Sequence, residues 1–234
     1  MSKGNMYKDV DDTRNFIGGR CPNNCSYCYV ESLKRFPVIK KKYSGKLRLI
    51  KNEFKKPLGK GKFIFIGSCN DMFADNIPAT WIIKILEYCS KYDNTYLFQT
   101  KNPERFFEFL NKFPKKTIFG TTIETDKSGL SMAYSNAPVP LDRIAVMCDL
   151  QKQKKQIMIS LEPLMEFNLN VITASIELIK PTYISIGADS KNHNLPEPSP
   201  EKVKALIKEL RKITKVIEKD NLKRLTNGIS KTNL

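Results

Sequence analysis

Residues 14–28 read Arg-Asn-Phe-Ile-Gly-Gly-Arg-Cys-Pro-Asn-Asn-Cys-Ser-Tyr-Cys: an apolar run, two glycines, and three cysteines within eight residues. Cys21, Cys25 and Cys28 have the spacing Cys-x3-Cys-x2-Cys, and no fourth cysteine lies nearby in the sequence. Structural zinc and ordinary ferredoxin clusters normally use four protein ligands. Three thiolates on a four-iron cluster leave one iron open, so the pattern indicates a reactive [4Fe–4S] cluster. A zinc knob or a packing cluster of thiols is the alternative.

Short apolar runs recur along the chain, each followed by an amphipathic stretch, and predict strands buried on both faces. The predicted strands are 14–18, 63–67, 95–100, 117–123, 156–161 and 182–187. Six strand–helix units predict an α/β fold with a parallel sheet. A complete eight-unit barrel typically needs about 250 residues. We therefore expect residues 1–234 to form one domain, an open six-stranded parallel (β/α)6 partial TIM barrel.

Helical spacing of apolar residues marks the segments between the strands. A helix is expected near Pro78, another after Asn102-Pro103, and a long last one over residues 200–218. The predicted buried stripes are Ile82, Ile85, Leu86 and Cys89; Phe106, Phe107, Leu110 and Phe113; Leu141, Ile144, Ala145 and Cys148; Ile172, Ile176 and Ile179; and Val203, Leu206, Ile207, Leu210 and Ile213. Cys89 and Cys148 are thus interpreted as packing residues.

The cysteine spacing, with the aromatic Tyr27 directly before the last cysteine, resembles the signature of the radical S-adenosylmethionine (SAM) superfamily. The resemblance covers about residues 14–217. It implies that Cys21, Cys25 and Cys28 hold a [4Fe–4S] cluster whose open iron binds SAM. Reductive cleavage of SAM would then yield a 5′-deoxyadenosyl radical that abstracts a hydrogen atom. The chain is similar to small phage-associated radical SAM proteins of unassigned reaction and shares features with spore photoproduct lyases.

The resemblance also implies contacts with SAM at the strand ends. Gly67, Ser68 and Asn70 are expected near its amino group, Lys101 near its carboxylate and Glu124 near its ribose hydroxyls, while Tyr27 completes the cofactor-binding set. Turn closure for the first three residues and a solvated lysine for Lys101 are the alternatives. Cys69 follows a strand end beside Ser68, as in the spore photoproduct lyases, and is predicted to donate a hydrogen atom.

Two later strand ends carry acids, Glu162 and Asp189, which are candidates for substrate contacts. Surface turn acids are the rival interpretation. His193, the single histidine, is expected to be solvated rather than catalytic, so histidine-based chemistry is nearly excluded.

The chain is strongly basic, with 40 Lys and Arg against 24 Asp and Glu and a formal net charge of +16. Residues 34–62 form a basic insertion with twelve Lys and Arg against one acid, Glu53, and with Phe36, Tyr43 and Phe54 interleaved. This mixture favours a nucleic-acid backbone and stacked bases. A solvated, partly flexible loop and a lysine-rich codon bias are the alternatives.

The prediction is therefore a radical SAM enzyme acting on a nucleic acid or nucleotide, served by a reductant protein such as flavodoxin or ferredoxin. A radical SAM enzyme for a peptide or small metabolite, and a non-catalytic iron–sulfur protein, are the rival functions. No stretch reaches the 18 to 20 apolar residues of a membrane helix, and residues 1–12 lack the apolar centre of a signal peptide. We expect a cytoplasmic monomer.

Overall fold

The computed structural model describes residues 7–227, so the first half of the polar N-terminal segment lies outside it. The chain divides into two compact units. The first unit takes Met1–Asn24 and Val30–Gly120, and the second takes Cys25–Tyr29 and Thr121–Leu234. No helix between residues 7 and 227 has the length and apolar character needed to cross a membrane.

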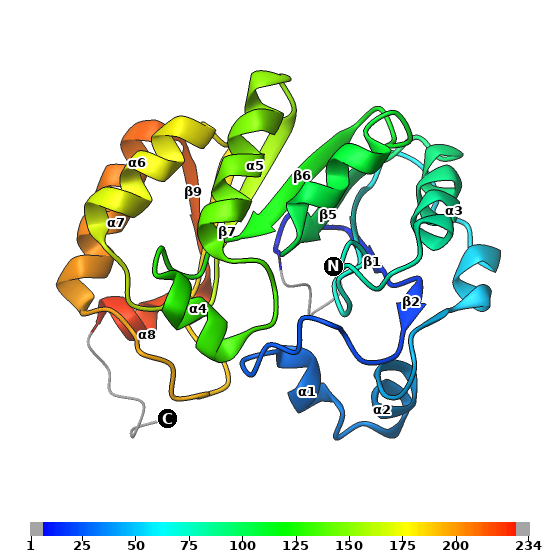
Figure 1. Ribbon diagram of the computed structural model, residues 1–234, viewed down its shortest axis with the longest axis horizontal. Coiled ribbons are helices and arrows are strands. Elements are labelled where there is room, and N and C mark those ends of the chain that lie inside the picture. The colour runs from blue at the N-terminus through cyan, green and yellow to red at the C-terminus, as the bar shows by residue number, and fades with distance from the viewer. Residues whose placement is uncertain (1–6, 228–234) are drawn as a thin grey trace. The chain divides into compact units, whose positions relative to one another are not determined.

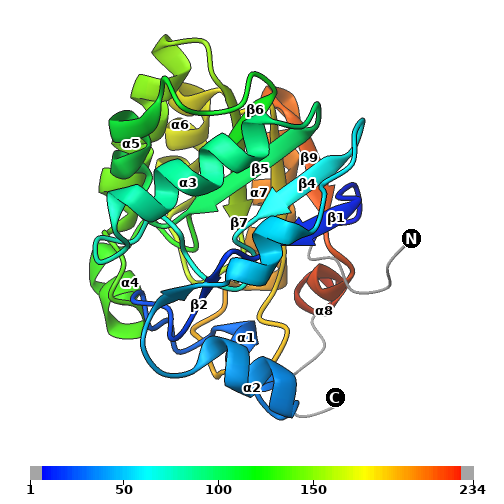
Figure 2. The same cartoon turned by 90° about the vertical axis from the view of Figure 1, so that its right-hand side faces the viewer.

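Parallel strands organise the first unit. Strand β1 (Asp12–Arg14) pairs with β4 (Phe63–Ile66), and β4 pairs with β5 (Thr95–Thr100). Figure 2 shows β1 and β4 side by side. Helix α3 (Ala79–Ser90) follows β4 and buries the predicted stripe of Ile82, Ile85, Leu86 and Cys89. The apolar centres of β4 and β5 are buried, as expected of strands covered on both faces, whereas the polar strand β1 is partly exposed.

Parallel strands also organise the second unit: β7 (Gln156–Leu161), β8 (Tyr183–Ile186) and β9 (Lys215–Glu218). Helices α6 (Leu169–Ile179) and α7 (Pro200–Ile213) pack against each other and connect them (Figure 1). Side chains cap both helices, because Asn168 accepts from the amides of Asn170 and Val171, and Ser199 accepts from that of Lys202. The remaining helices are α4 (Ser128–Tyr134), α5 (Pro140–Lys152) and α8 (Lys223–Thr226).

The parallel α/β class predicted from the sequence is confirmed, but the predicted number of six strands is wrong. The hydrogen-bonded order is β1-β4-β5-β6-β7-β8-β9, where β6 is Thr117–Thr122, so the sheet has seven strands and not six. The additional strand is β9. The predicted last helix ends at Ile213, and Thr214 has an extended backbone that leads into this strand.

Three other predicted elements differ in detail. The expected first strand divides, because Asp12–Arg14 joins the main sheet and β2 (Ile17–Gly18) pairs antiparallel with β3 (Arg48–Leu49). The segment after Asn102 is a 3₁₀ helix, Pro103–Phe109, which buries Phe109 where Phe107 was expected. Helix α5 turns Leu141 to solvent and buries Arg143 and Met147 instead.

The basic insertion has a defined structure in its own right. It contains α2 (Pro37–Tyr43), β3 and a 3₁₀ helix, Lys51–Lys55. A short helix, α1 (Tyr29–Leu33), precedes it. Arg48 donates hydrogen bonds to the carbonyls of Lys41, Lys42, Ser44 and Lys46, which closes the carboxyl end of α2. Hydrogen bonds of this kind satisfy the last carbonyls of a helix.

Candidate functional site

The first half of the cysteine loop, residues 21–28, lies in the first unit. Gly19 has a φ of +96°, and a Cβ there would lie 2.4 Å from the carbonyl oxygen of Lys46, so only glycine fits. The amide of Gly19 donates to the Lys42 carbonyl at 2.9 Å. Asn24 has a left-handed backbone, and its side-chain oxygen accepts from Arg20 at 2.7 Å. The backbone that leads to Cys21 is therefore packed and hydrogen-bonded against the backbone of residues 42–46.

The second half of the loop lies in the second unit. The Cys28 amide donates to the Cys25 carbonyl at 3.1 Å, and the Ser26 amide donates to the Tyr134 carbonyl at 2.9 Å. The Tyr27 ring is buried with Met165 and Leu195. Burial and the neighbouring Glu124, to which the Tyr27 hydroxyl donates, raise the pKa of this tyrosine well above its ordinary value.

The donor set of the loop fits an iron–sulfur cluster. None of the six cysteines, all of which the structure describes, forms a disulfide, and Cys21, Cys25 and Cys28 are each partly exposed. Within residues 7–227, no three His, Cys, Asp or Glu side chains converge on a single ion. A four-iron cluster does not require such convergence, because each thiolate binds a different iron.

The turn after β4, residues 67–71, is shaped by a glycine and an asparagine. Gly67 has a φ of +85° and donates its amide to the Arg14 carbonyl at 2.8 Å. Asn15 holds the turn from the opposite side, since its Nδ2 donates to Ser68 Oγ at 3.0 Å and its Oδ1 accepts from the Cys69 amide at 2.8 Å. The sequence predicts Asn15 to lie inside the strand 14–18, so this contact is not expected from it. The signal was a polar residue within an apolar run.

Asn70 carries an unsatisfied buried atom. Its Nδ2 donates to the Gly19 carbonyl at 3.0 Å, which fixes the orientation of the amide. Its Oδ1 is buried and has no hydrogen-bond partner among the described residues. An unmade bond at a buried acceptor costs about 1–3 kcal/mol. The arrangement leaves an acceptor for a ligand that brings its own donor.

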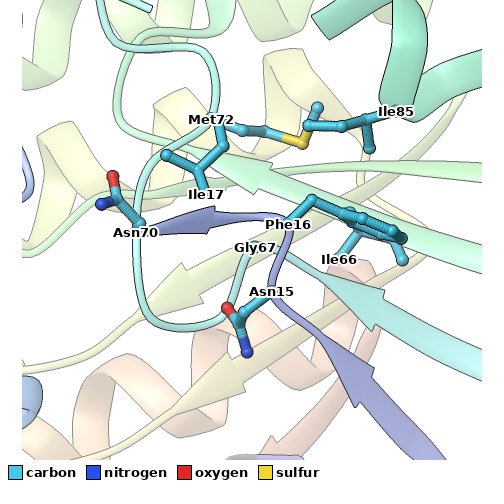
Figure 3. A pocket seen from close by; sticks show the side chains of 8 residues that line it. All are labelled: Asn15, Phe16, Ile17, Ile66, Gly67, Asn70, Met72 and Ile85. Carbon is cyan, nitrogen blue, oxygen red and sulfur yellow. The ribbon is translucent and has the colours of Figure 1, made fainter. Parts of the chain in front are cut away.

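A small pocket lies behind the same turn, but it has no room even for a water-sized molecule. Phe16, Ile66, Met72 and Ile85 form its apolar lining, and the Asn70 amide points away from Phe16 and Ile85 (Figure 3). Ligand pockets usually measure about 300–1,000 Å³. This space is therefore a gap in the packing behind the turn, and the Asn70 acceptor faces elsewhere.

Cys69 lies beside two hydroxyl groups. Ser68 Oγ is 3.7 Å from its sulfur, and the side chain of Tyr43 forms a hydrogen bond with it. Tyr43 is buried, and burial together with Cys69 raises the pKa of its hydroxyl. Because the Tyr43 ring is buried, it cannot stack on a nucleic-acid base as the basic insertion suggested. The donor role of Cys69 itself stays a prediction.

Lys101 follows β5 directly, as the sequence predicts. Its amide donates to Asp71 Oδ2 at 2.8 Å, which ties the end of β5 to the turn after β4. Lys101, Gly67, Ser68 and Asn70 therefore belong to neighbouring segments of the first unit. Their contacts with a cofactor stay predictions.

Glu124 forms a buried ion pair. Its Oε2 accepts from Arg143 Nη1 at 2.6 Å, both side chains are fully buried, and its Oε1 accepts from Tyr27. Arg143 also donates to the carbonyls of Thr122 and Pro138. The contact between Glu124 and a ribose stays a prediction, since both carboxylate oxygens already have protein partners.

A further polar group lies where β7, β8 and β9 end. Glu162 accepts from Lys219 and from Asn221, and a Cβ at Gly187 would lie 2.8 Å from Glu162 Oε1. Burial lowers the pKa of Lys219 despite this partner. The sequence predicts Glu162 at a strand end but not Lys219, because Lys219 follows β9, which the sequence pattern does not predict.

Asp189 and His193 form a second pair in the loop after β8. Asp189 Oδ1 lies 2.6 Å from His193 Nδ1, and the His193 side chain is only 20% exposed. The expectation of a solvated histidine is therefore wrong. Asp189 also accepts from the Lys191 amide at 3.1 Å. Hydrogen bonds from His193 and Lys191 lower the pKa of Asp189 although burial opposes them.

The chain belongs to the DUF5131 family, described as a protein of unknown function, which matches residues 10–197. No curated protein matches it in sequence. Spore photoproduct lyase complexed with dinucleoside spore photoproduct is a structural neighbour, with a TM-score of 0.61 and 11% identity over 87% of this chain and 75% of that one. A variant of that enzyme with bound AdoMet has a TM-score of 0.52 and 12% identity over 85% and 60% of the two chains.

The second kind of neighbour is Streptococcus suis SuiB bound to S-adenosylmethionine. Its TM-score is 0.56, with 11% identity over 94% of this chain and 53% of that one. Both neighbours are radical SAM enzymes. The resemblance stated from the cysteine spacing is thereby confirmed at the level of the fold, which is what likeness at this identity shows.

Proposed function

We propose that the protein is a radical SAM enzyme in which Cys21, Cys25 and Cys28 hold a [4Fe–4S] cluster. When bound, the cluster would supply the electron that cleaves SAM to methionine and a 5′-deoxyadenosyl radical. We propose in addition that the sheet forms an open partial barrel and that the protein is a monomer. A reductant protein such as flavodoxin or ferredoxin would deliver the electron to the cluster.

One observation carries the cofactor assignment: the unsatisfied Oδ1 of Asn70, in the turn that follows β4. An ammonium group has three donors and no acceptor. We propose that Asn70 accepts from the ammonium of SAM, with Gly67 and Ser68 in the same turn and Lys101 toward the carboxylate. Tyr27 and Glu124 are also proposed to contact SAM, with Glu124 near the ribose hydroxyls. Cys69 is the proposed hydrogen-atom donor.

Anaerobic reconstitution tests the proposal. The chain should bind about four irons, and SAM should change the electron paramagnetic resonance (EPR) spectrum of the reduced cluster and yield 5′-deoxyadenosine. Replacing Cys21, Cys25 and Cys28 by alanine should abolish iron binding, whereas Cys148→Ala, a control thiol, should retain it. Stoichiometric zinc without iron would overturn the cluster. A cluster whose EPR spectrum does not change when SAM is added would support the electron-transfer alternative.

We also propose that the substrate is a nucleic acid or nucleotide, and the basic insertion supports this. Lys40 and Lys41 are exposed on α2, and the Arg35 guanidinium lies over the ring of Phe36, which is 49% exposed. Exposed cations beside an exposed ring suit phosphates and a stacked base. Lys42, by contrast, bonds to Glu53 at 3.1 Å and serves the fold.

Charge reversal at Lys40 and Lys41 tests this substrate class. Each phosphate contact contributes about 0.9 to the slope of affinity against salt for a duplex. The double variant should therefore weaken binding to DNA or RNA and flatten the slope by about two. Reversal of Lys204 and Lys208, which are exposed on α7, is the control. Equal effects of the two reversals would make the charge non-specific and favour a peptide or small metabolite.

A further inference from the structure

One carboxylate in the first unit accepts four hydrogen bonds. Asp71 Oδ1 accepts from Thr100 Oγ1 at 2.7 Å and from the Phe73 amide at 3.0 Å. Its Oδ2 accepts from Asn23 Nδ2 at 2.7 Å and from the Lys101 amide at 2.8 Å. The four donors come from the residues that follow its own turn, from the end of β5 and from the cysteine loop.

Four bonds use the whole accepting capacity of a carboxylate, which has about four lone-pair sites. Asp71 therefore has no acceptor left for a bound cofactor. Its neighbour Asn70 differs, because one of its oxygen atoms is buried without a partner. Adjacent residues of one turn thus have different roles: Asn70 offers an acceptor, and Asp71 holds protein segments together.

The two residues fix the chain on both sides of Cys21. The side-chain Nδ2 of Asn70 donates to the carbonyl of Gly19, two residues before the cysteine, at 3.0 Å. Asp71 accepts from Asn23, two residues after it, at 2.7 Å. Asn23 is itself buried. Both contacts lie within the first unit, so the backbone around Cys21 is held to the turn after β4.

We propose that Asp71 is a positioning residue that orders the cysteine loop through Asn23 before the cluster is inserted. This inference rests on the proposed function for its purpose, although the hydrogen bonds are independent of it. Ordering a loop loses conformational entropy. A loop that is already ordered in the folded protein does not lose it again when iron and sulfide arrive, so assembly should be faster.

The test compares Asp71→Asn with Asp75→Asn. Asp75 lies four residues further on and accepts from Asn102 Nδ2 at 2.7 Å, and no contact with the cysteine loop is seen for it among the described residues. An amide at position 71 keeps one acceptor oxygen and turns an NH2 group toward donors, so two of the four bonds are lost. Asp71→Asn should speed hydrogen exchange of the backbone amides of Cys21, Asn23 and Asn24 in the apo-protein at least tenfold. Anaerobic iron incorporation should slow by a similar factor.

Asp75→Asn should change neither quantity, and the wild-type melting temperature serves as the reference for global stability. Asn23→Ala removes the donor instead of the acceptor, and it should reproduce the exchange effect if Asp71→Asn does not fold. Unchanged exchange in residues 21–24 would overturn the proposal, as would equal effects of the two aspartate variants. Hydrogen exchange needs no cluster. A wild-type chain that binds no iron would therefore refute the proposed function without deciding the role of Asp71.

Discussion

Arg143 and Glu124 form an ion pair of 2.6 Å in which neither side chain is exposed to solvent. A buried charge is tolerated only when its hydrogen-bonding groups are satisfied. Arg143 meets this condition, because Nε donates to the Pro138 carbonyl and Nη1 donates to the Thr122 carbonyl, both at 2.7 Å. Glu124 in turn accepts from Tyr27, which lies between Cys25 and Cys28. The pair thus supports the second half of the cysteine loop.

Arg143→Met should lower the free energy of unfolding by about 3–5 kcal/mol, since it leaves the Glu124 carboxylate buried without its partner. The double variant Arg143→Met, Glu124→Gln should recover part of this loss, because no lone charge then remains. Urea unfolding of the apo-protein measures both. Lys152→Met breaks an exposed pair with Asp149 and should leave the free energy of unfolding nearly unchanged. Equal losses for Arg143→Met and Lys152→Met would contradict the prediction.

Asn70→Ala should weaken SAM binding about tenfold, or about 1.4 kcal/mol, with little effect on stability. The variant loses one hydrogen bond to Gly19 but also removes the unsatisfied acceptor, and the two effects oppose each other. Calorimetric titration of the reconstituted protein gives the affinity, and urea unfolding gives the stability. Asp75→Asn is the control in the same segment. A large stability loss with unchanged affinity would assign Asn70 to the fold alone.

The three aromatic residues of the basic insertion should behave differently. Tyr43 is buried, and Phe54 packs between Phe16 and Tyr88, with ring centroids at 4.8 and 5.4 Å. Tyr43→Ala should therefore destabilise the protein by about 3–5 kcal/mol, as for a buried ring, and Phe54→Ala should destabilise it less because its ring is only partly buried. Phe36→Ala should leave stability nearly unchanged and weaken binding to single strands, because one stacked base contributes about 1–3 kcal/mol. Thermal unfolding and fluorescence anisotropy separate these effects.

The sequence predicts the strands well where the local pattern is sufficient. The expected bounds of β5 and β7 agree with the structure, because each has an apolar centre, residues 96–98 and 157–159, within a run of six residues between clear breaks. Strand β9 was missed because Val216 and Ile217 continue the spacing of the preceding helix. Pairing with β8 decides its conformation, and such a long-range contact leaves no local signal.

The candidate site was predicted less completely, for a related reason. Local order places Gly67, Asn70 and Lys101 after strands, and the structure confirms those positions without testing their roles. The contacts that hold the cysteine loop join distant segments: Asp71 reaches Asn23 across 48 residues. Arg143 lies on the buried face of α5, where the hydrophobic pattern favoured Leu141. A charged residue that is buried with its hydrogen-bond partners cannot be predicted from the periodic spacing of hydrophobic residues.

The stability of the second unit should depend on pH through Asp189. Hydrogen bonds from His193 and Lys191 outweigh burial and lower the pKa of this carboxyl below its ordinary value of 3.8. The unfolded chain then binds more protons than the folded chain in acid, so stability rises with pH across that range. The contribution of Asp189 should be fully present above about pH 5 and should be lost as the pH falls below 3.8. Asp189→Asn should flatten the dependence of the free energy of unfolding between pH 2.5 and 5, measured in urea. Asp149→Asn, at an exposed carboxyl, should leave the curve unchanged, and a wild-type slope in Asp189→Asn would contradict the assignment.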